Sequence, residues 1–250
     1  MISAKKFLLA LLLAPLAAMA AVGDVRLDRA PVNDRDLVSL QRGAQVFVNY
    51  CLNCHSANYM RYNRLQDLGL NEQQIRDNLI FSSAKVGDLM KIAMDPQDSK
   101  EWFGTPPPDL TVIARSRSSH LGPGSDWLYT YLRGFYRDAS RPSGWNNTVY
   151  PNVGMPHVLW ELQGEQVLKE TKVQAGGYMK TEMKLALDKA GKMAPPEYDR
   201  MVADLVNYMD YMAEPARHSR TTIGIYALLF LGLMFILAYM LKKEFWKDVH

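Results

Sequence analysis

The feature that most constrains this chain is the run Cys51-Leu52-Asn53-Cys54-His55. The pattern Cys-x-x-Cys-His is the attachment signature of a c-type haem, in which two thiols add to the porphyrin vinyl groups and the histidine ligates the iron. Two residues between the thiols let both reach one edge of the ring, and the next side chain then lies under the metal. The run therefore predicts a fold built around one covalently attached haem c.

A Cys-x-x-Cys pair also occurs in zinc sites, in thioredoxin-like redox pairs and in disulfides. Cys51 and Cys54 are the only cysteines among the 250 residues. A zinc site would need two further soft ligands, and no other cysteine can supply them. A thioredoxin-like pair normally stands beside a βαβ pattern, and none is visible here. The sequence therefore favours haem and leaves no cysteine for a stabilising disulfide.

The N-terminus has the pattern of a secretory signal peptide. Two lysines precede an apolar run from Phe7 to Ala18, and Ala18-Met19-Ala20 is a small-residue cleavage site. The apolar run is too short to span a bilayer. Export agrees with the haem motif, because c-type haem is attached on the outer side of the bacterial inner membrane. We therefore assign residues 1–20 to a signal peptide and expect residues 21–220 to form a periplasmic haem domain.

A second apolar run lies near the C-terminus, from Ile223 to Leu241, and contains no charged residue. Its length matches the hydrocarbon core of a membrane. A buried helix of a soluble domain would show polar interruptions at helical spacing, and this run has none. We therefore expect residues 222–241 to form one transmembrane helix. Because the signal peptide exports the body of the chain, residues 242–250 are expected to remain as a cytoplasmic tail.

Composition excludes some classes of function. The chain is 48% hydrophobic and 22% charged, which is typical of one or two globular domains. Its net charge of +3 is small and scattered, and no basic stripe or stacking motif accompanies it. Nucleic acid is therefore not expected as a partner.

Two segments of the exported part show strong helical periodicity. Asp36 is a plausible N-cap for a helix from Leu37 to about Tyr50. The second segment runs from Pro196 to Met212, and Pro215 prevents it from continuing. These are the longest helices that the exported part predicts.

The glycine inside the first helix indicates how the two helices are arranged. Gly43 costs about 1 kcal/mol relative to alanine in a helix, so we expect it to allow a close crossing. The predicted crossing packs Gly43 and Phe47 against Leu205 and Tyr208. The alternative is two independent amphipathic helices on the same core.

The remaining segments predict short helices joined by long loops. Helices are expected at Glu72–Phe81, at Gly87–Met94 and at Asp126–Phe135 with Ser125 as its cap. Glu101–Asp109 and Arg141–Pro156 read as loops, and Leu159–Tyr178 reads as short strands or an extended loop ending at Gly176-Gly177. The exported part is therefore predicted to be mainly α.

The sixth ligand of the iron decides function, because an open position favours gas or peroxide chemistry and a methionine favours electron transfer. The chain has 14 methionines, so abundance alone indicates nothing. Met155 lies in a loop between Gly154 and Pro156, where glycine allows close approach and proline stiffens the chain. Met193 fits almost as well, and Met179 less well. The residues alone leave this choice open.

Histidines are weaker candidates for the sixth ligand. His157 and His120 are both predicted in loops. A lone loop histidine more often faces solvent than binds a metal.

Several motifs occur in a fixed order along the chain. They are Cys51-Leu52-Asn53-Cys54-His55-Ser56 followed by Tyr59, Tyr62, Arg64 and Leu65; Pro107-Pro108-Asp109-Leu110; Ile113-Ala114-Arg115-Ser116-Arg117; Gly154-Met155-Pro156; and Ala213-Glu214-Pro215 before a single C-terminal anchor. From about Gly43 to the C-terminus, this order resembles the cytochrome c1 family, the haem subunits of ubiquinol–cytochrome c reductase. The resemblance implies a cytochrome c-like haem domain with long loop insertions plus one C-terminal transmembrane helix.

The resemblance also implies which residues hold the iron. Met155 would be the sixth ligand, opposite His55, and Met193 would only imitate the pattern. Pro108 resembles the family proline whose carbonyl accepts the N–H of the proximal imidazole, which fixes the orientation of that ring.

Three further residues acquire expected roles from the resemblance. Leu110 would pack on the haem face, and Arg117 resembles the arginine near the haem propionates. Where the family often has a tyrosine, this chain has Trp127 after a longer loop, so a propionate contact at that position stays open.

The function implied by the resemblance is electron transfer without a catalytic site of the chain's own. Electrons would arrive singly from the Rieske iron–sulfur protein and leave for a c-type cytochrome, in a complex with cytochrome b. The insertions Asn71–Thr105 and Leu159–Lys189 would pack on partner subunits. The alternatives are a membrane-tethered haem enzyme or sensor with an open or displaceable iron, and a free-standing membrane-anchored cytochrome c.

Overall fold

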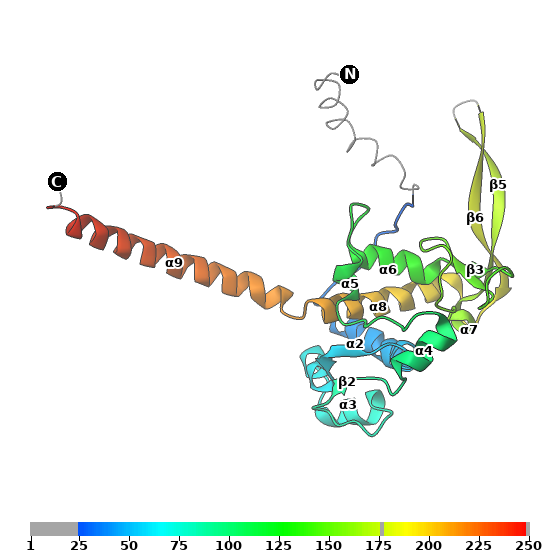
Figure 1. Ribbon diagram of the computed structural model, residues 1–250, viewed down its shortest axis with the longest axis horizontal. Helices are drawn as coiled ribbons and strands as arrows, with labels where there is room; N and C mark the ends of the chain where they lie inside the picture. Colours follow the sequence, from blue (N-terminus) through cyan, green and yellow to red (C-terminus); the bar gives the residue numbers. More distant parts are fainter. Residues whose placement is uncertain (1–24, 176–177, 249–250) are drawn as a thin grey trace, which may run out of the picture.

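The computed structural model describes residues 25–175 and 178–248. The predicted signal peptide at residues 1–20 and the glycine pair Gly176-Gly177 lie outside the described residues. The architecture is mainly helical, with one long hairpin and one long C-terminal helix extending from opposite ends of a compact body (Figure 1).

Helix α8 (Pro195–Ala213) is the central element of the body. Proline occupies its first position, where the missing N–H is not needed, and Pro215 follows its end. Its C-terminal half is buried almost all round, from Leu205 to Ala213. It packs against α2 (Leu37–Val46), α5 (Ile113–Ser116) and α6 (Gly124–Arg133). The haem-motif segment and the later loops are therefore positioned by elements that pack against α8.

The crossing of α2 and α8 is confirmed. A Cβ added at Gly43 would lie 2.0 Å from the Asp204 carbonyl oxygen and 2.7 Å from the Cβ of Tyr208. The rings of Phe47 and Tyr208 are 5.5 Å apart between centroids, and Leu205 is fully buried. The backbones thus meet at a distance that only glycine permits, so the alternative of two independent helices is wrong.

The first helix changes its geometry just before the cysteines. Asp36 caps α2 as predicted, because its Oδ1 accepts from the backbone N–H of Ser39 at 3.0 Å. The helix was expected to continue to about Tyr50. The regular α-helix ends at Val46, and the chain then continues helically through Cys51 as one π-helical turn, η2 (Phe47–Cys51). Such turns are frequent at functional sites, and this one delivers Cys51 to the edge of the core.

The segment after the haem motif differs in part from the prediction. Strand β1 (Ala57–Arg61) is followed by the 3₁₀ helix η3 (Tyr62–Leu68) and by α3 (Glu72–Leu79), which confirms the predicted helix there. The helix expected at Gly87–Met94 is wrong. That segment contains β2 (Leu89–Met90), which pairs antiparallel with β1 and buries Met90.

Two other predicted boundaries were also wrong. The loop expected from Glu101 begins only after α4 (Pro96–Phe103), which Asp95 caps. Helix α6 begins after Pro123, and Ser125 lies buried within its first turn rather than capping it.

The region after α6 forms small antiparallel pairs. Strand β3 (Phe135–Arg137) pairs with β4 (Trp145–Asn147), which lies inside the segment expected to be only loop. The short helix α7 (Trp160–Gln163) follows the Met155 loop. The β3–β4 pair therefore anchors the chain just before it reaches Met155.

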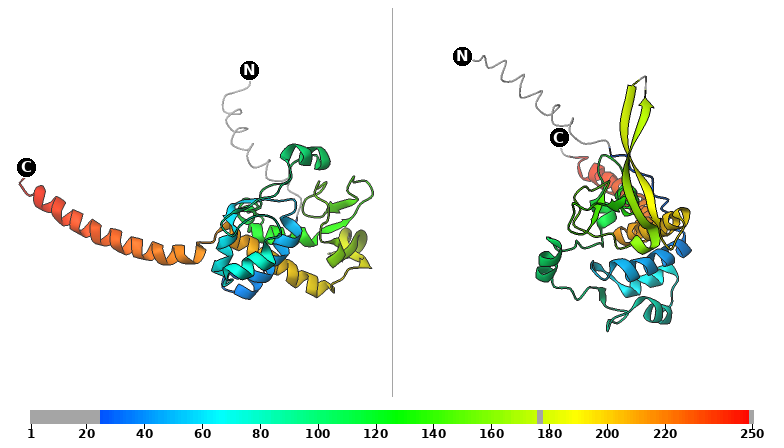
Figure 2. Two further views of the ribbon diagram at one scale, coloured as in Figure 1. Left: turned by 90° about the horizontal axis from the view of Figure 1, so that it is seen from below. Right: turned by 90° about the vertical axis from the view of Figure 1, so that its right-hand side faces the viewer.

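The long hairpin consists of β5 (Gly164–Ala175) and β6 (Tyr178–Ala190), where short strands or an extended loop were expected. It projects from the body in Figure 1 and in the right-hand view of Figure 2. At its base, Glu165 accepts from Arg137 at 2.9 Å and from Lys189 at 3.0 Å. The ion pair with Arg137 joins the base of the hairpin to β3.

Helix α9 (Arg217–Phe245) extends from the opposite end of the body (Figures 1 and 2). Within it, Ser219–Phe245 is long and apolar enough to cross a membrane, with a mean hydropathy of 2.3 in its most apolar stretch. No other helix in the described part of the chain meets that test. One candidate span near the C-terminus fits a single-pass membrane protein.

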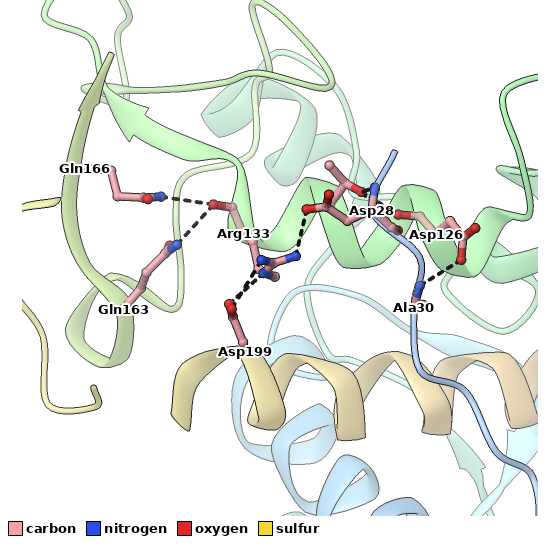
Figure 3. A network of polar contacts seen from close by, with 8 residues as sticks. Asp28, Ala30, Asp126, Arg133, Gln163, Gln166 and Asp199 are labelled. Carbon is pink, nitrogen blue, oxygen red and sulfur yellow. Dashed lines mark hydrogen bonds and ion pairs between the residues drawn. The ribbon is translucent and has the colours of Figure 1, made fainter. Parts of the chain in front are cut away.

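Figure 3 shows the corner that joins α6, α8, the hairpin base and the N-terminal segment. The Arg133 guanidinium donates to both carboxylate oxygens of Asp199, at 2.6 and 3.2 Å, and to Asp28 at 3.0 Å. The carbonyl of Arg133 accepts from the side-chain amides of Gln163 and Gln166 at 3.1 and 3.0 Å. Because a forked guanidinium holds a carboxylate through two bonds, this residue connects four segments at one point.

Candidate functional site

All the residues predicted to contact the cofactor line one cavity of ≈ 380 Å³. They come from the η2 turn and the haem motif, from the loop before α5, from the residue that follows α5 and from the loop before α7. The predicted residues in this lining are Cys51, Cys54, His55, Pro108, Leu110, Arg117 and Met155. The fold therefore brings together side chains that are up to a hundred positions apart in the sequence.

The two cysteines lie on one tight turn. The backbone N–H groups of Cys54 and His55 both donate to the carbonyl of Cys51, at 3.1 and 2.9 Å. Both cysteines are free thiols. Burial raises the pKa of the Cys51 thiol to about 12, and the neighbouring Cys54 adds to the shift. Two thiols three positions apart on one tight turn suit the two vinyl groups at one edge of a porphyrin.

A zinc site has no further support elsewhere. Among residues 25–175 and 178–248, no group of three or more His, Cys, Asp or Glu side chains is placed to hold a metal ion. The geometry of the cysteine turn therefore favours haem attachment over the alternatives that the sequence left open.

His55 is buried, and its Nδ1 lies 2.8 Å from the carbonyl oxygen of Pro108. A carbonyl can only accept, so Nδ1 carries the hydrogen and Nε2 is left with a lone pair for a metal. Burial lowers the pKa of His55, opposed by the Pro108 contact and by the charge of Asp109, so the ring is held neutral. The Leu110 N–H donates to the Ser56 carbonyl at 2.9 Å, which keeps the proline loop against the motif.

Met155 is half-buried in the lining of the same cavity. The hydroxyl of Tyr131 lies 3.4 Å from its sulfur. A Cβ added at Gly154 would lie 3.3 Å from the carbonyl oxygen of Phe103, so the loop passes close to the segment after α4. A thioether sulfur has two lone pairs, and a hydroxyl that occupies one of them leaves the other for a metal.

The other methionines lie in different places. Met193 lines a separate, more open pocket between α2 and α8, together with Arg42 and Glu197. Met179 lies in β6 of the projecting hairpin, where it pairs with Gln174. Met209 of α8 is buried and lines the haem-motif cavity, whereas the sequence pattern indicated only a core position. No sequence signal separates Met209 from the core methionines beside it.

The histidine alternatives do not reach the cavity lining. His157 was expected to face solvent, but it is 2% exposed. Its ring stacks on Phe135 at 4.7 Å and meets Trp145 edge-on at 5.0 Å. His120 is exposed, as expected. His55 is therefore the one imidazole among the described residues that line the cavity.

Part of the cavity lining combines a cation with aromatic rings. The guanidinium carbon of Arg117 lies 4.6 Å from the centroid of Trp127 and 5.8 Å from that of Tyr150. Trp127 in turn stacks on Tyr131 at 4.7 Å. All of these side chains line the cavity. Sequence reasoning missed Tyr131 and Tyr150, for which the aromatic-rich helix and the loop before Met155 were the available signals.

The donor set fits a c-type haem. It consists of two thiols on one turn, a neutral imidazole with a free Nε2, and a thioether, within a lining of leucine, valine, proline and aromatic side chains. The lining also contains the Arg117 guanidinium, a cation that would pair with acidic groups of a porphyrin. This combination would allow covalent attachment and two iron ligands of the kind that give electron transfer.

Comparison with known proteins agrees with this geometry. Residues 28–249 match the model described as the cytochrome C1 family. The chain is 51% identical over 250 residues to the cytochrome c1 of Allochromatium vinosum, covering 98% of this chain and 100% of that protein. It is 52% identical over 246 residues, 98% of each chain, to a Nitrosomonas europaea protein named ammonia monooxygenase gamma subunit. It is 26% identical to the cytochrome c1 of Rhodospirillum rubrum, covering 86% and 83%.

The resemblance found in the order of the sequence motifs is thereby confirmed over nearly the whole chain. Members of this family carry covalently attached haem c. They are the electron-transfer haem subunits of the bc1 complex, and so serve as redox subunits of a larger enzyme. The chain belongs to the cytochrome c1 family.

Proposed function

We propose that His55 and Met155 are the two axial ligands of the iron, and that Cys51 and Cys54 form the thioether bonds to the haem. The observation that carries this proposal is that these four side chains line one cavity, with a Pro108 carbonyl on Nδ1 of His55 and a hydroxyl on the sulfur of Met155. When bound, the haem supplies one-electron redox chemistry.

The chain's own residues orient the ligands and exclude water. Pro108 holds the ring of His55 in one tautomer, as a partner of this kind does for other metal-binding histidines. Leu110 supplies an apolar wall of the cavity, and Arg117, in the same lining, would pair with the propionates of the haem. Tyr131 donates to the sulfur of Met155. We assign none of these groups a role as an acid, a base or a nucleophile, and we propose, from family membership, that the domain is a redox subunit without a catalytic site of its own.

We further propose that the domain takes single electrons from the Rieske iron–sulfur protein and passes them to a c-type cytochrome, while docked to cytochrome b. Family membership supports these partners, because the bc1 complex is where such subunits work. The hairpin supports a role for Leu159–Lys189 in subunit packing, since an isolated two-stranded hairpin is only marginally stable in water. The same role is proposed for Asn71–Thr105.

The proposed topology places residues 21–220 in the periplasm, residues 222–241 across the inner membrane and residues 242–250 in the cytoplasm. The signal-peptide pattern and the exposed, apolar surface of α9 support it. A small tag at the C-terminus should be protected from protease in intact spheroplasts and cleaved after lysis. Cleavage in intact spheroplasts would reverse the orientation.

The ligand assignment is tested by replacing methionines in the intact chain and recording spectra after mild-detergent purification. Met155→Leu should abolish the far-red absorption band of methionine-ligated iron and allow carbon monoxide to bind the reduced protein. Met193→Leu is the matched control and should change neither. Carbon monoxide binding by the unmodified protein would favour a haem enzyme or sensor, and purification without cytochrome b would favour a free-standing carrier.

A further inference from the structure

Two consecutive asparagines are buried beside the loop that carries Met155. Asn146 is 6% exposed and Asn147 is fully buried. A buried amide is unfavourable unless its polar atoms are satisfied, and here the nitrogen and the oxygen of both amides have partners, most of which are backbone groups. The pair lies on β4 and neither side chain lines the cavity itself. Its contacts therefore indicate what it holds in place.

Asn147 bridges α6 and the start of the loop. Its Nδ2 donates to the carbonyl of Tyr131 at 2.8 Å. Its Oδ1 accepts from the backbone N–H groups of Val149 and Tyr150, at 2.8 and 3.2 Å. One side chain thus connects the residue that touches the sulfur of Met155 with the chain segment that leads to Met155.

Asn146 holds the middle of the same loop. Its Oδ1 accepts from the backbone N–H of Asn147 at 2.9 Å and of Asn152 at 2.8 Å, and its Nδ2 donates to Asp138 at 2.8 Å. Asn152 has a φ of 63°, a left-handed conformation that non-glycine residues rarely adopt. The Arg141 guanidinium also donates to the carbonyl of Asn152, at 3.0 Å. The turn before Met155 is therefore held in a conformation it would not keep alone.

These contacts take the place of a covalent cross-link. The chain has two cysteines, and both belong to the haem motif. The loop from Thr148 to Met155, which follows β4, is outside regular helix and strand, so its backbone lacks the regular hydrogen bonds of a sheet or helix. Side-chain amides that satisfy backbone groups in such a loop restrict its conformations. Asn146 and Asn147 restrict the conformations of the loop that carries Met155 in this way.

We propose that Asn146 and Asn147 are positioning residues that keep the sulfur of Met155 at the iron. The proposal rests on the proposed function, in which Met155 is the axial ligand. Asn147 acts on both sides of the Tyr131–Met155 contact, because it binds the backbone of Tyr131 and the backbone of the loop. Loss of either amide frees the loop, so that the thioether leaves the metal for part of the time and an external ligand can enter.

The test replaces each asparagine in the intact chain and compares it with an equally buried asparagine elsewhere. Asn207 is 2% exposed and bonds to Asn33 and Ser39, away from the cavity. Asn146→Ala and Asn147→Ala should lose part of the far-red methionine band, bind carbon monoxide when reduced and show a lower midpoint potential. Asn207→Ala should lower the Tm by a similar amount while it keeps the band and excludes carbon monoxide.

Two results would overturn the proposal. One is that both Asn146→Ala and Asn147→Ala lower the Tm yet keep the band and the midpoint potential. The other is that Asn207→Ala binds carbon monoxide to the same extent, since the effect would then follow from lost stability alone. If Asn147→Ala does not accumulate, Asn147→Ser keeps a polar group that is too short to reach the Tyr131 carbonyl, and the same spectra decide.

Met155→Leu separates this proposal from the ligand assignment. If Met155→Leu keeps the far-red band, the assignment of Met155 is wrong and the positioning role is wrong with it. If Met155→Leu loses the band while both asparagine variants keep it, only the positioning role is wrong.

Discussion

The hydroxyl of Tyr131 lies 3.4 Å from the sulfur of Met155, within the reach of an O–H···S hydrogen bond. Tyr131 is fixed between Trp127, which stacks on its ring at 4.7 Å, and Phe135, which meets it edge-on at 5.1 Å. Burial raises the pKa of Tyr131, against the opposing charge of Arg117, so the hydroxyl remains protonated and can donate. A donor at the sulfur withdraws electron density from it.

The first prediction follows from this contact. Tyr131→Phe removes the donor and keeps the ring, so the sulfur becomes a stronger electron donor and favours oxidised iron. Only the part of the hydrogen-bond energy that differs between the two redox states shifts the midpoint potential, so a bond of about 0.5–1.5 kcal/mol sets an upper limit of roughly 20–60 mV on the fall for one electron. Redox titration of the intact protein measures this shift. An unchanged potential would mean that the hydroxyl does not act on a ligated sulfur, and Tyr129→Phe on the same helix is the control.

The second prediction concerns the crossing of α2 and α8. Gly43→Ala places a Cβ 2.0 Å from a carbonyl oxygen of the facing helix, so the two backbones must separate. Overpacking of this kind costs about 1–3 kcal/mol of stability. We expect a loss near the upper end of this range, because the added Cβ meets backbone atoms, which cannot rotate away as a side chain can. Gly87→Ala is the matched control, because nothing lies within 4 Å of its added Cβ. Chemical denaturation followed by haem absorbance should separate the two variants, and equal midpoints would contradict the close crossing.

The parts of this fold that the sequence predicted correctly are those set by local spacing. The haem motif is complete within Cys51–His55, and the helical period of α8 is visible in its own residues. Gly43 indicated the crossing because glycine in a helix interior needs a reason. The apolar run of α9 was evident from length and hydropathy alone.

The parts that failed depend on pairing between distant segments. Gly87–Met94 reads as a helix but forms β2, because the edge of β1 lies beside it. Met155 and Met193 looked almost equal in sequence, and only the path of each loop puts them in different pockets. His157 looked like a solvent-facing loop residue, although the stack of Phe135 and Trp145 buries it. In each case the structure of the segment is set by partners that are not its neighbours in the sequence.

The third prediction tests whether His157 has any part in ligation. Its Nε2 makes no hydrogen bond of good geometry among the described residues, although the Gln163 side chain is close enough to oppose the lowering of the His157 pKa by burial, and its ring lies flat on Phe135. His157→Phe keeps an aromatic ring there and removes a buried polar atom without a partner, which is neutral or stabilising. The variant should keep the absorption spectrum and midpoint potential, with a Tm equal to or above the original. Loss of the low-spin spectrum would instead make His157 an iron ligand.

The last prediction concerns the base of the hairpin and its dependence on pH. The pKa of Glu165 is lowered to about 2, first by the Arg137 guanidinium and then by Lys189. A carboxylate whose folded pKa is depressed contributes stability above its ordinary pKa, and that contribution is lost as the pH falls towards the folded value. From the ordinary value of 4.5 down to about 2, the ion pairs at the hairpin base should therefore weaken progressively.

The measurement is amide hydrogen exchange in β5 and β6 at pH values between 5 and 3, with rates corrected for intrinsic acid dependence. In the original chain, protection from exchange near Glu165 and Lys189 should decrease as the pH is lowered, because opening the hairpin releases the carboxylate to bind a proton. Glu165→Gln should start with lower protection and show a flatter pH dependence, since its amide does not titrate. Other carboxylates titrate in the same range, so the difference between the two chains is the quantity that decides. Parallel curves for both chains would mean that Glu165 does not hold the hairpin to the body.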